Sequence, residues 1–202
     1  MDLVTQAKWD KAAPNFDVMA GGAAEERWLP KKTELFSHMQ GKILFLALGT
    51  GLDIPAFPTG QTIETIDIST EMLKQAQTRL DAYDGNINAQ VMDVHELDFN
   101  DNEFDQVYTS CTFCSVPNPV EGLKSLKRVL KPGGELRMFE HTGSQYYPFK
   151  LMMDFMSQIS RRVGPDMNRT TVANVQAAGI QIQRVNNVFL DVVKTITAVK
   201  PV

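Results

Sequence analysis

Short apolar runs alternate with amphipathic segments through the middle of the chain. The runs predict five strands, at residues 43–48, 62–67, 87–92, 104–110 and 135–140. Between them, apolar residues recur at helical spacing over about 70–80 and 119–130, and Ser69 or Thr70 is a good N-cap for the first of these helices. This alternation is typical of an α/β fold with a mainly parallel sheet.

The last third of the chain has a different pattern. From residue 149 the period is helical, and six apolar residues share one face: Phe149, Met152, Met153, Met156, Ile159 and Val163. This face is either core or a pliable lid over an apolar ligand, since methionine adapts to irregular shapes. A short helix over 171–179 precedes two strands, 180–189 and 191–199, which are joined too tightly for a crossover helix. They predict an antiparallel hairpin at the end of the sheet.

Composition places the chain among ordinary globular proteins. Its 202 residues predict one domain, and its net charge of −4 gives no basic footprint for nucleic acid. No apolar run reaches the ~20 residues of a membrane span, and the first residues lack a signal pattern. We therefore expect a cytoplasmic protein without a nucleic-acid partner or an integral membrane segment. Basic pairs at 31–32 and 161–162 leave weak peripheral membrane contact open, and the sequence does not predict the oligomeric state.

Three polar features follow successive strands. The turn after the first strand contains Gly49 and Gly51, but Ile54 stands where a dinucleotide fingerprint needs a third glycine. Asp67 ends the second strand, where a carboxylate can accept ribose hydroxyls, and Asp93 follows the third, near an adenine amino group. Each feature also has a purely structural explanation. The glycines could form a tight turn without a ligand, Asp67 could cap a helix, and Asp93 could be a solvated loop acid. Their order along the chain favours a nucleoside site.

Five stretches resemble motifs of the class I S-adenosylmethionine-dependent methyltransferases. They are residues 46–51 (LALGTG), 66–73 (IDISTEML), 92–94 (MDV), 104–107 (FDQV) and 128–134 (RVLKPGG). The resemblance implies a Rossmann-like fold with a seven-stranded, mainly parallel sheet and an antiparallel C-terminal hairpin. It also implies S-adenosylmethionine as cofactor, S-adenosylhomocysteine as product and no metal. The cofactor contacts it implies are Ala47, Gly49, Thr50, Gly51, Asp67, Ile68, Met72, Asp93, Val94, Ser110 and Cys111.

A narrower resemblance is to the methyltransferase-like thiol S-methyltransferases and the bacterial phosphatidylethanolamine N-methyltransferases. It rests on residues 31–37 (KKTELFS), 49–55 (GTGLDIP), 57–60 (FPTG), 113–119 (FCSVPNP) and 139–141 (FEH). The resemblance implies a small or lipid-like apolar methyl acceptor, with a thiol favoured and a phospholipid amine as the alternative.

The N-terminal residues 9–17 resemble the segment that folds over the cofactor in quinone and phospholipid methyltransferases. We therefore expect a single methyltransferase domain over residues 1–202 in four parts. These are a helical lid (1–40), a cofactor-binding core (41–140), an acceptor-side helical insertion (141–170), and a helix with the C-terminal hairpin (171–202).

Two positions depart from the family pattern. Phe45 stands in place of an acid that helps to organise the polar end of the cofactor, and Ala47 stands in place of the first glycine. These departures keep a second hypothesis open, in which the chain is a weak or non-catalytic S-adenosylmethionine-binding module.

One residue is a candidate general base. His141 follows the fifth strand, and the ordinary pKa of histidine lies near neutrality. The alternative is a structural histidine that only forms hydrogen bonds with nearby backbone atoms. Cys111 and Cys114 form a C-x-x-C pair, which is either a redox or metal site or part of the cavity wall. We expect the pair to line the methyl-transfer cavity.

Overall fold

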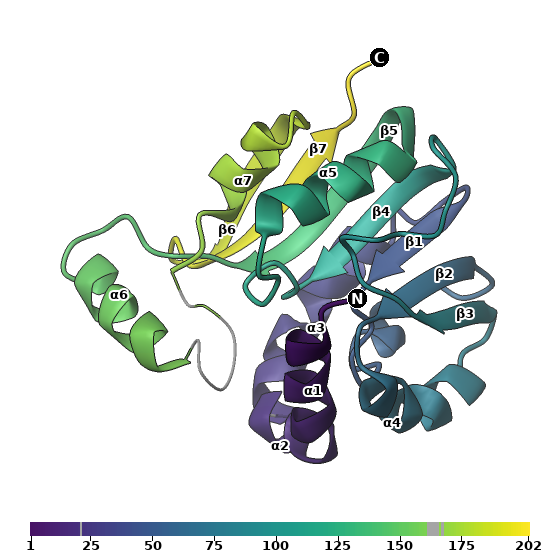
Figure 1. Cartoon of the computed structure of the whole chain (residues 1–202), viewed down its shortest axis with the longest axis horizontal. Coiled ribbons are helices and arrows are strands. Elements are labelled where there is room, and N and C mark those ends of the chain that lie inside the picture. The colour runs from purple at the N-terminus through teal and green to yellow at the C-terminus, as the bar shows by residue number, and fades with distance from the viewer. Residues whose placement is uncertain (21, 161–165, 167) are drawn as a thin grey trace.

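Seven strands form one sheet in the order β3-β2-β1-β4-β5-β7-β6 (Figure 1). The computed structural model describes residues 1–20, 22–160, 166 and 168–202. The strands are β1 (Ile43–Leu46), β2 (Thr62–Asp67), β3 (Asn86–Val91), β4 (Phe104–Ser110), β5 (Leu130–His141), β6 (Gln181–Phe189) and β7 (Val193–Val199). Strands β1 to β5 pair in parallel, and β7 is antiparallel to both β5 and β6. The predicted fold class is confirmed.

Strands β2 and β4 have their predicted bounds, and the other five differ at their ends by one to five residues, as β1 and β5 illustrate. β1 ends at Leu46 rather than at residue 48, because Ala47 adopts a left-handed backbone with φ +56°. β5 begins at Leu130 instead of residue 135, with a register shift in its pairing partner between Phe104 and Gln106. Both differences lie at strand ends, where a hydrophobic pattern carries the least information.

Helices cover both faces of the sheet. One face carries α5 (Pro119–Val129) and α7 (Thr171–Ala177), whose apolar side chains pack on Leu44 and Leu46 of β1. The other face carries α4 (Thr70–Asp81) and α3 (Gly22–Phe36), which pack on Ile43 and Phe45. Alternate residues of β1 therefore belong to two separate cores.

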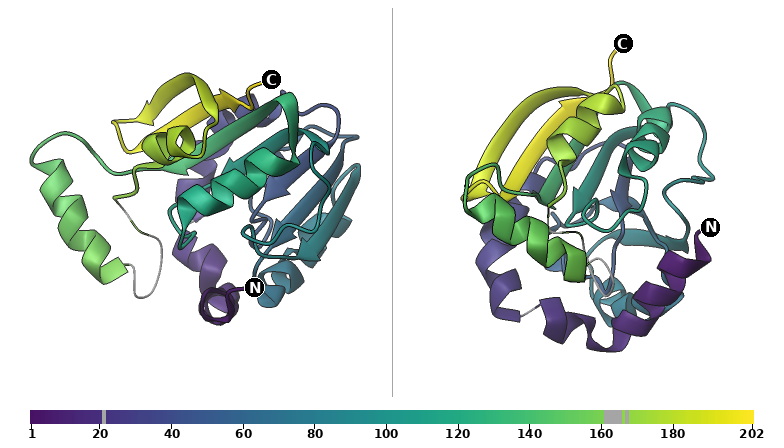
Figure 2. Two further views of the ribbon diagram at one scale, coloured as in Figure 1. Left: turned by 45° about the horizontal axis from the view of Figure 1, so that its top comes forward. Right: turned by 60° about the vertical axis from the view of Figure 1, so that its left-hand side comes forward.

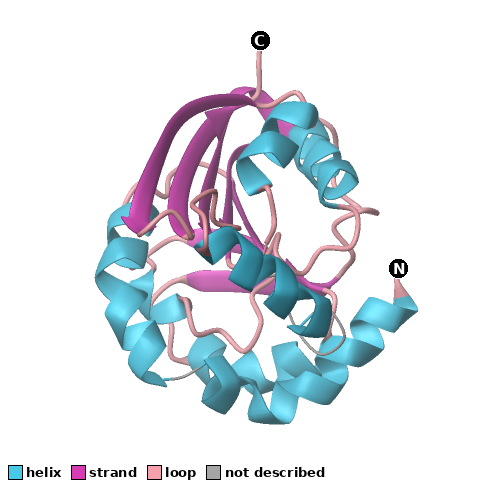
Figure 3. Cartoon of the chain, turned by 90° about the vertical axis from the view of Figure 1, so that its left-hand side faces the viewer, coloured by secondary structure: helices cyan, strands magenta, loops and turns pink. Residues whose placement is uncertain are grey.

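The remaining helices lie outside these two layers. The chain begins with α1 (Leu3–Ala12), the 3-10 turn η1 (Ala13–Asn15) and α2 (Phe16–Ala20), and Figure 3 shows them with α3 as a curved row of helices beside the sheet. A second 3-10 turn, η2 (Ile54–Ala56), follows β1. The helix α6 (Phe149–Ser160) follows β5 and stands clear of the sheet in Figures 1 and 2.

The methionine-rich face of α6 is not a core face. Met153 is buried, but Phe149, Met152 and Met156 are each about half exposed. The side chain of Ile159 and the whole of Val163 lie outside the described residues. The helix is confirmed over Phe149–Ser160, but the predicted face is divided between the buried Met153 and three exposed side chains.

Phe45, which replaces the family's acid, is fully buried in an aromatic cluster. Its ring centroid lies 5.6 Å from that of Phe36 and 4.8 Å from that of Phe57. The side chain therefore belongs to the core between the sheet and α3, where an aromatic ring packs well and a carboxylate would be desolvated.

Restoring the acid should unfold the protein rather than improve its site. We expect Phe45→Asp to lower the free energy of unfolding by more than about 4 kcal/mol, because it removes a buried ring and buries a charge. Phe45→Leu is the control and should cost about 1 kcal/mol. Urea denaturation measures both, and equal stability of the two variants would show that residue 45 is not a core position.

Candidate active site

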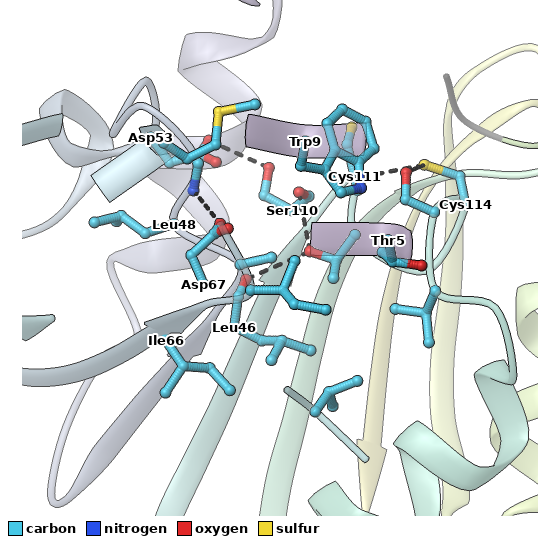
Figure 4. A pocket seen from close by; sticks show the side chains of 18 of the residues that line it. Thr5, Trp9, Leu46, Leu48, Asp53, Ile66, Asp67, Ser110, Cys111 and Cys114 are labelled. Carbon is cyan, nitrogen blue, oxygen red and sulfur yellow. Dashed lines mark hydrogen bonds between the residues drawn. The ribbon is translucent and has the colours of Figure 1, made fainter. Parts of the chain in front are cut away.

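A cavity of about 430 Å³ lies between the N-terminal helices and the carboxyl ends of the parallel strands (Figure 4). The N-terminal helices contribute Thr5, Trp9, Phe16, Trp28 and Lys32. The loops after β1, β2, β3 and β4 form the opposite wall. Ligands of open α/β sheets bind at this edge, and the volume falls within the usual range for small-molecule sites.

The structure brings most of the predicted cofactor contacts to this one cavity. Its lining includes Ala47, Gly49, Thr50, Asp67, Ile68, Met72, Asp93, Val94, Ser110 and Cys111, together with the predicted base His141. Gly51 is not part of the lining. A Cβ atom at Gly51 would lie 2.9 Å from Ile54 Cδ1 and 3.4 Å from Ala76 Cβ, so this glycine lets the loop pack against α4.

The other glycine of the turn faces the cavity. Gly49 has φ +60°, and a Cβ atom there would meet only Phe16 Cε1, at 3.9 Å. The space that a side chain would fill is thus part of the cavity, and a ligand can approach the backbone directly. This is the close approach that the two-glycine pattern predicts, and it fits the polar end of a nucleoside cofactor.

Asp67 joins the first two strand-end loops. Its Oδ2 accepts from the Gly49 N–H at 2.8 Å, and its Oδ1 accepts from the Ser69 N–H at 2.8 Å. Burial raises the pKa of Asp67 to about 6. Ser69, not Asp67, caps α4, accepting from the Met72 N–H at 3.0 Å. Each carboxylate oxygen keeps a second lone pair that can accept from a ligand hydroxyl.

Asp93 anchors the start of the chain. Its Oδ2 accepts from the Asp2 N–H at 2.8 Å, and its Oδ1 lies 2.7 Å from His95 Nδ1 and accepts from the His95 N–H at 3.0 Å. Burial acts to raise the pKa of Asp93, but these hydrogen bonds outweigh it and hold the pKa below its usual value. The side chain is buried, so it is not a solvated loop acid.

Polar contacts hold the N-terminal helices over the cavity. Asp10 Oδ1 accepts from Ser69 Oγ at 2.6 Å, and Asp17 binds Thr50 Oγ1 at 2.5 Å and the Arg79 guanidinium at 2.7 Å. All ten residues of α1 are described, and none of them is buried. Helix α1 is therefore attached by side-chain hydrogen bonds rather than by an apolar core.

A buried ion pair closes one end of the cavity. Lys32 Nζ lies 2.8 Å from Asp53 Oδ1, and Ser110 Oγ donates to the same oxygen at 3.2 Å. In the sequence, Lys32 was identified only as a member of the basic pair at residues 31–32, and its inward position was not predicted. Its spacing from Trp28 and Phe36 on one helical face was the signal that it points inward.

Glu140 supports the loop that forms one wall of the cavity, and the sequence pattern did not predict this role. It is fully buried, and it accepts from Thr109 Oγ1 at 2.6 Å, the Phe113 N–H at 3.1 Å and the Thr112 N–H at 3.3 Å. Burial raises the pKa of Glu140 to about 7. The carboxyl group fixes the loop after β4, which carries Cys111. Its signal was an acid directly after the two apolar residues Met138 and Phe139 near the end of the strand.

The two cysteines lie in this loop. Cys111 has φ +50° and lines the cavity, and Cys114 Sγ donates to the Cys111 carbonyl at 3.1 Å. Burial raises the pKa of the Cys111 thiol well above its usual value and that of Cys114 to about 12. Reactive redox cysteines have lowered pKa values, so these neutral thiols have the character of a cavity wall. The described residues hold no cluster of three or more metal-ligating side chains.

His141 lies at the end of β5 with its ring at the cavity. Its Nδ1 is buried and has no hydrogen-bond partner among the described residues. Burial lowers the pKa of His141, so the imidazole is neutral at pH 7. The neutral imidazole of a residue that lines the cavity can accept a proton from a bound molecule through a ring nitrogen that faces it.

Comparison with known proteins agrees with this geometry. A family model described as a methyltransferase domain matches residues 44–138. The ubiquinone/menaquinone biosynthesis C-methyltransferase UbiE of Geotalea daltonii is 33% identical, with 74% of this chain and 68% of that protein covered. The chain belongs to the class I S-adenosylmethionine-dependent methyltransferases, and S-adenosylmethionine is the cofactor that this membership implies.

Relatives with different acceptors are comparably similar. The phosphatidylethanolamine N-methyltransferase of Cereibacter sphaeroides is 28% identical, with 61% of this chain and 62% of that enzyme covered. Thiol S-methyltransferase TMT1B of Homo sapiens is 28% identical, with 76% of this chain and 70% of that enzyme covered. The crystal structure of the 4+2 cyclase SpnF superimposes with a TM-score of 0.74 at 17% identity, covering 98% of this chain and 95% of that chain. Family membership therefore leaves the acceptor open.

Asp67 should be needed for cofactor binding. Asp67→Ala removes the acceptor that fixes Gly49 and the candidate ribose contact, so we expect S-adenosylmethionine to bind about tenfold more weakly or worse. Titration calorimetry on the full chain measures this. Asp81→Ala, an exposed acid at the end of α4, is the control and should bind normally. Unchanged affinity in the Asp67 variant would exclude a ribose contact.

Glu140 should make stability depend on pH. Its pKa rises from 4.5 in the unfolded chain to about 7 in the folded protein, so the folded state holds a proton that the unfolded state has lost. Burial destabilises the ionised form of Glu140 in the folded protein. The free energy of unfolding therefore falls as pH rises from about 4.5 through 7, by about 3 kcal/mol for this group. Urea denaturation should show a smaller loss between pH 5 and 8 for Glu140→Gln. An identical loss in both proteins would contradict this assignment.

Proposed function

We propose that this protein transfers a methyl group from S-adenosylmethionine to a small or apolar acceptor, with a thiol as the first choice. The observation that carries the proposal is the neutral imidazole of His141, a residue that lines the same cavity as Gly49 and Asp67. We also propose that residues 1–40 act as a lid and that residues 141–170 form the acceptor side.

The chemistry asks little of the protein beyond positioning. S-adenosylmethionine would be held by the loops that carry Gly49, Asp67 and Asp93, and it would supply a methyl group on a cationic sulfur. Cavity walls that fix the cofactor and the acceptor supply much of the acceleration. His141 takes the proton of the acceptor as the new carbon–acceptor bond forms. Trp9, Phe16 and Trp28 exclude water, which favours the merging of a thiolate with a cationic donor.

The charges that line the cavity favour a thiol over an amine. An ammonium acceptor would gain most from a carboxylate that has no other hydrogen-bond partner. The lining carboxylates already accept hydrogen bonds within the protein: Asp2 from Val4, Asp53 from Ser110, Asp67 from Gly49 and Ser69, and Asp93 from Asp2 and His95. A phospholipid amine is the second candidate, and the exposed apolar face of α6 is the observation that favours it.

The positions of Phe45 and Ala47 support an active enzyme over a weak binding module. Phe45 stabilises the core, and the Lys32–Asp53 pair is available to organise the polar end of the cavity. Ala47 already adopts the left-handed backbone that a glycine would favour, with its methyl group at the cavity.

His141 provides the test of the proposed reaction. With labelled S-adenosylmethionine and a panel of thiols, we expect His141→Ala to lower kcat about 100-fold while cofactor affinity stays within about twofold of normal. His38→Ala, an exposed histidine, is the control. The acid limb of the wild-type kcat profile should lie below pH 6.5, because burial lowers the pKa of this base and only its neutral form is active.

Three results would count against parts of the proposal. Full turnover by His141→Ala would exclude the base. Label appearing only in the lipid of phosphatidylethanolamine vesicles would replace the thiol by the phospholipid amine. Absence of binding heat with either S-adenosylmethionine or S-adenosylhomocysteine would exclude the enzyme altogether.

A further inference from the structure

Helix α6 presents an apolar surface to the outside of the molecule. Five of its large apolar side chains are 48% to 67% exposed: Phe149, Leu151, Met152, Phe155 and Met156. Tyr146 and Tyr147, just before the helix, are 69% and 79% exposed. We call these seven residues the α6 surface.

The helical geometry puts the five exposed side chains on one side. At 100° per residue they fill an arc of roughly 160°. Met153 and Ser157 project from the other side and are buried. Lys150 and Asp154 form a polar edge, with Nζ and Oδ2 2.9 Å apart. The helix is thus amphipathic, but its broad apolar side points away from the protein.

The base of α6 is joined to the wall of the cavity. Before the helix, Ser144 Oγ and the Gln145 N–H donate to the Asp191 carboxylate, at 2.8 Å and 2.7 Å. After it, the Asp166 N–H donates to the Cys114 carbonyl at 2.8 Å, and Arg169 donates to the Val116 carbonyl at 3.1 Å. Cys114 and Val116 line the cavity. Asp166 and Arg169, which follow α6 in the chain, therefore contact the cavity wall.

The size of this surface argues against a second copy of the chain as its occupant. A stable dimer buries about 800 Å² per partner, from about 20–30 residues. The α6 surface has seven residues on one 12-residue helix and the turn before it. Figure 1 shows this helix as a projection from the body, and no other helix or strand of the described residues lies beside it there to widen the contact.

Its chemistry matches a lipid surface. Aromatic rings with a polar atom, as in Tyr146 and Tyr147, favour the boundary between headgroups and acyl chains, and an outward apolar arc can enter that boundary. Residues 145–162 contain three basic side chains and one acidic one, in a chain whose net charge is −4. A local excess of positive charge complements anionic lipids.

We infer that the α6 surface docks on an anionic membrane, with the helix lying in the plane of the headgroups. This inference goes beyond the proposed reaction, because docking needs no catalysis. In combination with the proposed function, it identifies the acceptor as an apolar molecule that is dissolved in lipid and reaches the cavity past Cys114 and Val116.

Flotation with vesicles tests the docking directly. The full chain should float with vesicles of phosphatidylcholine and phosphatidylglycerol, and less with phosphatidylcholine alone. The double variant M152S/F155S should partition roughly tenfold more weakly, because bilayer affinity scales with buried apolar area. Val91→Thr replaces an exposed apolar residue on β3, at the opposite end of the strand order from β6, and should float normally.

The outcomes separate docking from catalysis. Wild-type protein that does not float, or a double variant that floats equally well, overturns the docking surface. A concentration-dependent dimer in light scattering that the double variant abolishes also overturns it, in favour of self-association. Since Met152 and Phe155 do not line the cavity, the double variant should bind S-adenosylmethionine within about twofold of the wild-type affinity in titration calorimetry, which shows that it is folded. Flotation without any methyl transfer supports docking and contradicts only the proposed function.

Discussion

The buried carboxylate of Asp67 is the contact on which the site depends. The Gly49 N–H from the loop after β1 and the Ser69 N–H at the start of α4 converge on it. Beyond the end of β1, the Leu48 N–H still donates to the Ile66 carbonyl, and the next backbone donor, the Gly49 N–H, is satisfied by the Asp67 side chain. The carboxylate is desolvated at a cost, as its raised pKa shows. In return, the Asp67 carboxylate holds the backbone of Gly49, which is open to the cavity, beside a negative charge.

The N-terminal helices depend on the same frame. Ser69, which α4 needs as its cap, donates its hydroxyl to Asp10 of α1, and Thr50 of the glycine turn donates to Asp17 of α2. Such side-chain hydrogen bonds form and break with little change in buried apolar area, so each contributes only about 1 kcal/mol. A cover attached in this way can open for ligands while the sheet beneath it stays intact.

The sequence predicted those features that a linear pattern records. Apolar runs predicted the strands, and the two glycines predicted the turn whose backbone faces the cavity. The linear pattern did not predict contacts between residues that are distant in the sequence. Gly51 packs on α4, whereas Gly49 faces the cavity, and both look alike in sequence. Lys32 pairs with Asp53 only because α3 crosses the end of the sheet. Such partners are distant in sequence, so a motif could identify the cavity but not its complete wall.

Two helices outside the layers of the sheet have opposite chemistry. Helix α1 buries none of its ten described residues and is attached through side chains such as Asp10. Helix α6 turns an apolar arc outward. None of the helices within the described residues has both the length and the apolar character needed to span a bilayer. Under the proposed function, the polar attachment of α1 suits a charged cofactor that arrives from water, and the apolar arc of α6 suits an acceptor that is dissolved in lipid.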